Sequence, residues 1–131
     1  MKTGIKFNKM VDKVAQGKKN RRDGAAFERK VRADLIDMGW NVDKFTNNIF
    51  EGEVKAAKTN RWMMRSMGFP DFIIWKGFGS SFKVEGVECK TNGRLDKIEK
   101  EKCQIYLDKE VFARIWIASK DGTKIKYTLF G

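Results

Sequence analysis

The sequence predicts an α/β fold in which helices flank a mixed central β-sheet, and two observations carry this prediction. First, residues 68–90 hold two apolar, β-branched and aromatic runs, 69–75 and 82–89, separated by Gly77-Phe78-Gly79-Ser80-Ser81. That composition is typical of strand, turn and strand, so a β-hairpin is expected here. Second, apolar residues recur at helical spacing before and after the hairpin. With 131 residues and 41% hydrophobic content, the chain can bury the core of one domain.

The first 22 residues predict a basic N-terminal arm that precedes a folded domain at 23–131. Residues 1–23 carry eight lysines and arginines against two aspartates, a net charge of +6. Phe7, Val11 and Val14 fall at helical spacing, which predicts a short helix over about 6–16 followed by a flexible basic linker. The arm is either a solubilising terminus or a phosphate grip, and in the second case its contacts are Lys18, Lys19, Arg21 and Arg22.

A helix is expected over 24–38, followed by a first strand over 40–45. Asp23 is a good N-cap and Gly39 ends the pattern. Glu28 borders the apolar stripe of this helix, which consists of Phe27, Val31, Leu35 and Met38. A glutamate in that position is usually only solvated, but it would also supply a second acidic group beside the hairpin.

The segment 46–67 has a weaker pattern. Asn47-Asn48 predicts a turn, and 53–67 can form a helix with basic residues every three or four positions on one face. That face is either solvated or a ridge that contacts phosphates through Lys55, Lys58, Arg61 and Arg65.

After the hairpin, the pattern predicts a helix over 95–109, a strand over 113–119, a turn at Asp121-Gly122 and a final strand over 124–130. Lys97, Lys100 and Gln104 share one face of the predicted helix. The two lysines are further candidate DNA contacts, and Gln104 is either a surface amide or part of a site.

Three of the charged residues in the predicted hairpin, Asp71, Glu88 and Lys90, lie near the ends of its strands. Glu88 and Lys90 share one face of the second strand while Cys89 points the other way, because side chains alternate along a strand. A tight register brings Asp71, at the start of the first strand, to the same end. Unpaired charges are costly on a half-buried sheet, and a divalent cation would compensate for them. Carboxylate oxygens suit Mg²⁺ or Mn²⁺.

The spacing of Pro70-Asp71 and Glu88-Cys89-Lys90 resembles the PD-(D/E)XK nuclease superfamily. Gly24-Ala25-Ala26-Phe27-Glu28 looks like the glutamate-bearing first helix of that superfamily, and Gln104 is similar to a glutamine that some members place after the lysine. The resemblance covers about 23–120. It implies a restriction-endonuclease-like core in the order αβββαβ, and the short chain looks most like the archaeal and phage Holliday junction resolvases.

The resemblance also implies roles. Asp71, Glu88 and the backbone carbonyl of Cys89 would bind Mg²⁺ or Mn²⁺, and Lys90 would orient the attacking water or neutralise developing charge. Glu28 would bind a second metal ion or its water, and Gln104 would hold Lys90 or the scissile phosphate. In the alternative without catalysis, Glu88 and Lys90 form an ordinary salt bridge.

Charge and composition narrow the class of function. The net charge of +11 favours a polyanionic partner such as DNA. The absence of histidine excludes Ser-His-Asp and Cys-His nucleophile systems. No 18-residue apolar run and no leader-like segment are found, so a cytoplasmic or nucleoid-associated protein without membrane contact is expected. Cys89 and Cys103 are expected to be reduced thiols.

The first hypothesis is a metal-dependent, structure-selective endonuclease that resolves branched DNA in recombination and repair. It would act as a homodimer, because paired nicks in a symmetric junction need two active sites. The alternatives of the same fold are a nuclease of the VRR-NUC type and a restriction- or homing-type duplex cutter. From another class comes a nucleic-acid-binding module that cuts nothing.

Overall fold

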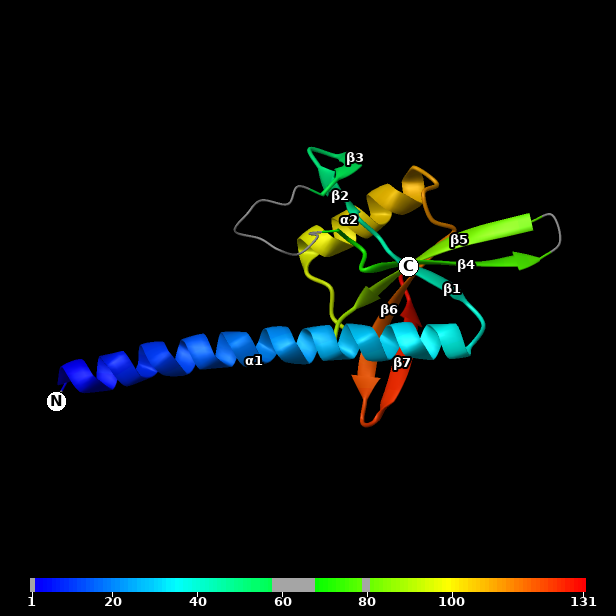
Figure 1. Cartoon of the computed structure of the whole chain (residues 1–131). Coiled ribbons are helices and arrows are strands. Elements are labelled where there is room, and N and C mark those ends of the chain that lie inside the picture. The colour runs from blue at the N-terminus through cyan, green and yellow to red at the C-terminus, as the bar shows by residue number, and fades with distance from the viewer. Residues whose placement is uncertain (1, 58–67, 79–80) are drawn as a thin grey trace.

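The computed structural model describes residues 2–57, 68–78 and 81–131. Its helices and strands are drawn in Figure 1 and follow the chain in this order: α1 (Lys2–Asp37), β1 (Asn41–Lys44), β2 (Asn47–Phe50), β3 (Glu53–Ala56), β4 (Phe72–Phe78), β5 (Ser81–Cys89), α2 (Lys97–Asp108), β6 (Arg114–Asp121) and β7 (Lys124–Leu129).

Five strands form one mixed sheet in the order β1-β4-β5-β6-β7. Strands β5 and β6 are parallel, and the other neighbouring pairs are antiparallel. Parallel neighbours need a crossover connection, and α2 supplies it between β5 and β6. The predicted α/β fold with a mixed central sheet is therefore confirmed.

The central hairpin is also confirmed, and its register places the acidic residues. Phe72 of β4 pairs with Val87 of β5, and the pairing continues to Phe78 and Ser81. Asp71 directly precedes β4 and Glu88 follows Val87 in β5, so these two residues meet at the end of the hairpin that lies away from Phe78 and Ser81.

The helices cover opposite faces of the sheet, which gives three layers (Figure 1). The α1 face buries Phe27, Val31 and Leu35 against a set of apolar strand residues: Phe72, Ile74, Val87 and Ala118. The α2 face buries Cys103 and Tyr106, and Tyr106 packs edge-to-face on Phe45 and Phe112. The acidic end of the hairpin thus lies between two packed layers.

Helix α2 starts at a capping box. The Asp96 side chain accepts a hydrogen bond from the Glu99 N–H at 2.8 Å, and the Glu99 carboxylate accepts one from the Asp96 N–H at 3.0 Å. These two bonds satisfy amides at the N-terminus of the helix that have no intrahelical partner. The helix expected over 95–109 is confirmed, and so are the strands expected over 40–45, 113–119 and 124–130.

The predicted break between a basic arm and a first helix is wrong. Helix α1 runs without interruption from Lys2 to Asp37, so Asp23 lies inside it and caps nothing. The residues around Gly17 and Gly24 are good helix formers, chiefly alanine, lysine and arginine, which outweighs two glycines and one aspartate. In Figure 1 the N-terminal half of α1 extends beyond the sheet.

The predictions for the segment after β1 are also wrong where the structure describes it. Asn47 and Asn48 lie in β2 rather than in a turn, and residues 53–56 form β3 rather than the start of a helix. The turn is at Glu51-Gly52, where both residues have positive φ, at 53° and 76°. A two-residue hairpin turn of this kind matches the twist of its strands. Of the predicted basic ridge, Lys55 lies on β3, whereas Lys58, Arg61 and Arg65 lie outside the described residues.

The segment that leads into β4 is held against β1 and β2. The Phe69 N–H donates to the Asn47 carbonyl, and the Phe45 N–H donates to the Asp71 carbonyl, at 2.9 and 3.0 Å. At Gly68 an added Cβ would lie 2.0 Å from the Phe45 carbonyl oxygen, so only glycine fits there. This close approach fixes where Asp71 enters the sheet.

None of the helices in the described ranges is long and apolar enough to cross a membrane.

Candidate functional site

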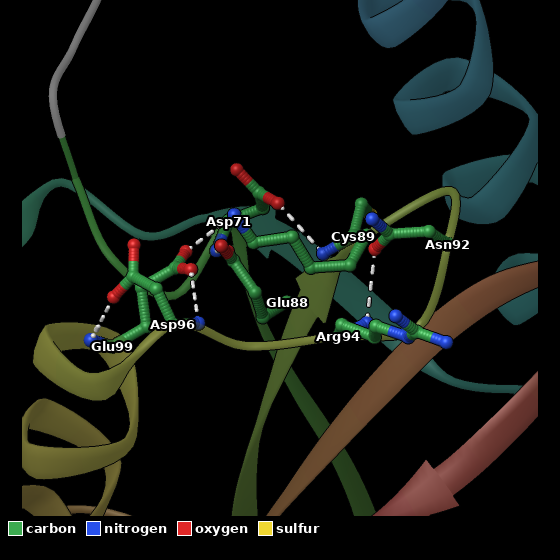
Figure 2. Close-up of polar contacts among 8 residues, drawn as sticks. Asp71, Glu88, Cys89, Asn92, Arg94, Asp96 and Glu99 are labelled. Carbon is green, nitrogen blue, oxygen red and sulfur yellow. Dashed lines mark hydrogen bonds and ion pairs between the residues drawn. The ribbon is translucent and has the colours of Figure 1, made fainter.

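Asp71 and Glu88 are locked together by hydrogen bonds in both directions. The Asp71 N–H donates to Glu88 Oε1 at 3.1 Å, and the Cys89 N–H donates to Asp71 Oδ2 at 2.8 Å. Figure 2 shows the two side chains where the start of β4 meets the end of β5. Each carboxyl group therefore has one oxygen bound to the backbone of the opposite strand, and a second oxygen remains for other partners.

The environment of Glu88 disfavours its negative charge. The residue is only 5% exposed. Burial raises its pKa well above the ordinary value, the Asp71 carboxyl raises it further, and Lys90 opposes the shift only in part. A buried carboxyl group that faces a second carboxyl group is stabilised in its charged form by a bound cation.

Lys90 lies one residue beyond β5 and is held by the start of α2. Its Nζ is 2.6 Å from Glu99 Oε2, and its N–H donates to the Ala118 carbonyl. Burial alone would lower the pKa of Lys90, but the hydrogen bond and charge of Glu99, followed by the charge of Glu88, outweigh it and raise the pKa. The ammonium group is therefore positively charged at neutral pH beside the Asp71–Glu88 pair.

Glu99 is a site residue that the sequence interpretation missed. Its Oε1 accepts from the Asp96 N–H while its Oε2 faces Lys90, so one carboxylate ties the helix cap to the lysine. Figure 2 shows Asp96 and Glu99 approaching the hairpin end from α2. The Asp96-x-x-Glu99 spacing is a readable capping box, and this signal could have predicted where the glutamate lies.

The alternation expected around Cys89 is confirmed. Cys89 packs with the core on the α1 face, whereas the charge of Glu88 acts on Cys103 of the α2 face. Both cysteines are free. Burial, followed by the charges of Asp71 and Glu88, raises the pKa of Cys89, and burial raises that of Cys103 to about 12. Neither thiol ionises near neutral pH, so neither is a nucleophile.

Glu28 lies on α1 and is close to Asp71. The two residues line one cavity of about 300 Å³. The charge of Glu28 also contributes to the raised pKa of Cys89, whose N–H is bound to Asp71. The structure thus brings three of the predicted acidic and basic groups around Asp71, namely Glu28, Glu88 and Lys90.

Gln104 does not join this group through any contact with Lys90. Its side-chain amide donates to Asp108 Oδ1 at 2.8 Å, one turn further along α2, and the residue is exposed. Lys90 is bound by Glu99 instead. A role of Gln104 toward a scissile phosphate stays a prediction.

The predicted phosphate contacts that the structure describes are exposed and lie on regular elements. Lys18, Lys19, Arg21 and Arg22 lie on α1, and Lys97 and Lys100 lie in the first turn of α2. Lys55 on β3 lies 3.8 Å from Glu53, an exposed pair of little energetic weight.

The end of the hairpin offers few donors to a metal ion. Across the part of the chain that the structure describes, no group of three or more His, Cys, Asp or Glu side chains could hold a metal ion. The available set is two carboxyl groups, of Asp71 and Glu88, and the backbone carbonyl of Cys89. Mg²⁺ commonly binds through one or two carboxylates and keeps waters and substrate phosphates as its other ligands, so this oxygen set fits Mg²⁺ or Mn²⁺.

A scan against protein-family models finds no match for this chain. Neither a search of curated proteins nor a search of solved structures finds a match.

Proposed function

We propose that this protein is a metal-dependent nuclease that hydrolyses DNA phosphodiesters at the Asp71–Glu88 pair. The observation that carries the proposal concerns Glu88. This residue is 5% exposed and is held against the Asp71 carboxyl group, and the positively charged Lys90 follows two residues later in the chain. Without a bound cation this arrangement lowers the stability of the fold. Buried ionisable groups with perturbed pKa values cluster at functional sites.

The order of elements supports the same proposal. If the β2–β3 hairpin is set aside as an insertion and β7 as an added strand, the chain runs α1, β1, β4, β5, α2, β6, which agrees with the αβββαβ order of a restriction-endonuclease-like core. Asp71 and Glu88 fall at the start of the second core strand and the end of the third. The resemblance in sequence places its acidic residues at these same positions.

In this proposal the carboxyl groups of Asp71 and Glu88 and the Cys89 carbonyl hold Mg²⁺ or Mn²⁺. The bound ion supplies Lewis acidity toward a phosphoryl oxygen and lowers the pKa of a water. The backbone hydrogen bonds from Asp71 and Cys89 keep both carboxyl groups aimed at the same point. Lys90 donates hydrogen bonds to the attacking water or to a phosphate oxygen, and Glu99 keeps it charged and oriented.

The substrate is proposed to be branched DNA. The net charge of +11 favours a polyanion, and one site per 131-residue chain means that two copies are needed for paired nicks in a four-way junction. The same site would serve a VRR-NUC-type or a restriction- or homing-type nuclease acting on duplex DNA, so the substrate has to be tested directly.

The test is cleavage of a labelled four-way junction and of a matched linear duplex, with Mg²⁺ or with a chelator. We expect Mg²⁺-dependent, symmetric paired nicks in the junction and a dimer in solution. Equal cutting of both substrates would keep the chemistry and replace the junction preference with duplex cleavage. Tight, salt-dependent binding without cutting under any divalent ion would leave a binding module and refute the proposed activity.

A further inference from the structure

The cavity beside Asp71 carries a second kind of chemistry besides its two acidic residues. Its volume is about 300 Å³, and Arg29, Arg32 and Lys44 line it together with Glu28 and Asp71. None of the three basic residues stands out in the sequence, because they come together only in the folded chain. The cavity therefore places positive charge next to the proposed metal ligands.

Regular elements hold the three cations in place. Arg29 and Arg32 are three residues apart on α1, so they are neighbours on one side of the helix. Lys44 ends β1 and pairs with Phe72, the residue after Asp71. The Phe45 N–H bonds to the Asp71 carbonyl at 3.0 Å, which fixes β1 beside the entry of β4. The cations thus have a set position relative to Asp71.

Folding alone does not explain these charges. Within the described residues, the side chains of Arg29, Arg32 and Lys44 take part in no ion pair, and all three residues are exposed. Like charges one turn apart on a helix are mildly destabilising. Lys90 and Arg114, by contrast, each lie beside a glutamate. Glu28 and Asp71 line the same cavity, but within the described residues none of the three cations forms an ion pair with them, so the cations are suited to an anionic ligand.

We propose that Arg29, Arg32 and Lys44 form a phosphate subsite that seats a nucleic-acid phosphate next to the one at Asp71. The inference rests on the proposed nuclease function for the scissile phosphate at Asp71. The subsite itself requires only the cavity and its basic residues. Guanidinium groups match phosphate oxygens through paired hydrogen bonds, and a lysine adds a point charge. Seating the adjacent phosphate fixes the position of the scissile one.

Helix α1 continues this subsite into a track. The cavity at Asp71 shares Ala25 and Arg29 with a second hollow, and that one shares Arg22 with a third, lined also by Lys18. Lys18, Arg22, Arg29 and Arg32 fall on one helical stripe. This stripe of 14 residue steps is about 21 Å long, so it can contact more than one phosphate of a nucleic-acid strand. The unbroken α1 keeps it in line with Asp71.

The test measures binding of a fluorescent oligonucleotide by anisotropy as a function of salt, with a chelator present so that nothing is cut. The variant is R29Q/R32Q, and the control is K124Q/K126Q, with the same charge change on the exposed strand β7 at the opposite sheet edge from β1. Loss of two phosphate contacts should weaken binding about 25- to 60-fold at 0.1 M salt and lower the salt slope by about 1.4–1.8. K44Q should show a smaller loss of the same kind.

Equal losses in R29Q/R32Q and the control pair, with unchanged slopes, would overturn the subsite. Comparing 5′-phosphorylated with 5′-hydroxyl oligonucleotides identifies the phosphate. If the wild type prefers the phosphorylated end and R29Q/R32Q does not, the subsite takes a terminal phosphate. Equal binding of both ends means an internal phosphodiester. Binding is measured without cleavage, so the two proposals can fail separately. A protein that binds through these arginines but never cuts would refute the nuclease proposal and support the subsite.

Discussion

Glu85 and Glu88 lie three residues apart on β5 and are each 5% exposed, yet their side chains have different partners. The Glu85 Oε1 accepts a hydrogen bond from Trp116 Nε1 at 2.9 Å and lies 4.0 Å from the Arg114 guanidinium, both on β6. Glu88 faces the Asp71 carboxyl group, and burial together with that group raises its pKa.

The difference separates a structural acid from a candidate catalytic one. A buried carboxylate is tolerated when a neighbouring strand supplies donors and a cation, and Glu85 has both. Glu88 receives one backbone N–H and faces a second acidic group, and Lys90, which is paired with Glu99, offsets the effect of that group only in part. The fold therefore stabilises the buried Glu85 side chain without any ligand, whereas the buried Glu88 side chain needs a bound cation or a proton to be stable in its position.

The largest effect is expected from removing the charge that faces Glu88. Asp71→Asn takes away one proposed metal ligand and leaves the backbone geometry in place. Cleavage should fall by about 10⁴-fold, the upper end for a group that moves or activates protons, because the bound ion supplies both the nucleophile and charge stabilisation. The measurement is single-turnover cleavage with Mg²⁺, and the control is Asp43→Asn, an exposed aspartate on β1. Wild-type cleavage by Asp71→Asn would refute the assignment.

Replacing the lysine beside Glu88 should have the next largest effect. Lys90→Met removes a charged donor from the site, and losing one such donor costs about 10²–10³ in rate. Lys83→Met is the matched control, since Lys83 is an exposed lysine of β5, the strand that ends one residue before Lys90. Equal rates for the two variants would exclude Lys90 from the chemistry.

Glu99 should act through Lys90, as a positioning residue. Its hydrogen bond and charge raise the pKa of Lys90, so Glu99→Gln lowers that pKa. If the ammonium form is the active one, the alkaline limb of the pH–rate profile moves to lower pH, while the rate at low pH changes little. An unshifted profile would show that Lys90 does not depend on Glu99.

Substitution of Glu85 and of Glu88 should change the free energy of unfolding in opposite directions. Glu85→Gln replaces a charge-assisted hydrogen bond to Trp116 with a neutral one, at a cost of about 1 kcal/mol in the free energy of unfolding. Glu88→Gln removes a carboxyl group whose charged form is disfavoured, so it should stabilise the cation-free protein at neutral pH. Urea unfolding in a chelator measures both, and equal signs would remove the contrast.

The smallest effect concerns the pH dependence of that stability. The pKa of Glu88 is higher in the folded state than in the unfolded chain. Between the ordinary glutamate pKa and the raised one, the folded protein holds a proton that the unfolded protein has lost, so stability falls as pH rises through this window. Glu88→Gln should flatten the fall, and Mg²⁺ should offset it only in the wild type.

The sequence predicted the hairpin and its acidic end because both depend on local rules. Two β-branched and aromatic runs define the strands, and the antiparallel pairing of these strands brings Asp71 to Glu88. The predictions failed where local signals compete. Asp23 and the two glycines indicate a break, but the helix formers around them carry α1 through.

Other features could not be predicted because they depend on tertiary contact. Arg29 and Lys44 lie in different elements, and only the packing of α1 against β1 and β4 puts them into one cavity. The β2–β3 hairpin was missed since its charged residues suit a helix as well as an exposed strand. Glu99 was readable as a cap residue, but its contact with Lys90 depends on how α2 docks on the sheet.

The most direct measurement compares Glu88→Gln with Glu85→Gln in cleavage of the same labelled DNA with Mg²⁺. The substitutions are chemically identical and fall on the same strand at equal burial. We expect Glu88→Gln to lower cleavage as far as Asp71→Asn does, by about 10⁴-fold, while Glu85→Gln cuts at the wild-type rate. Cleavage by Glu88→Gln, or equal loss in both variants, would contradict the claim that the Asp71–Glu88 pair is the centre of the chemistry.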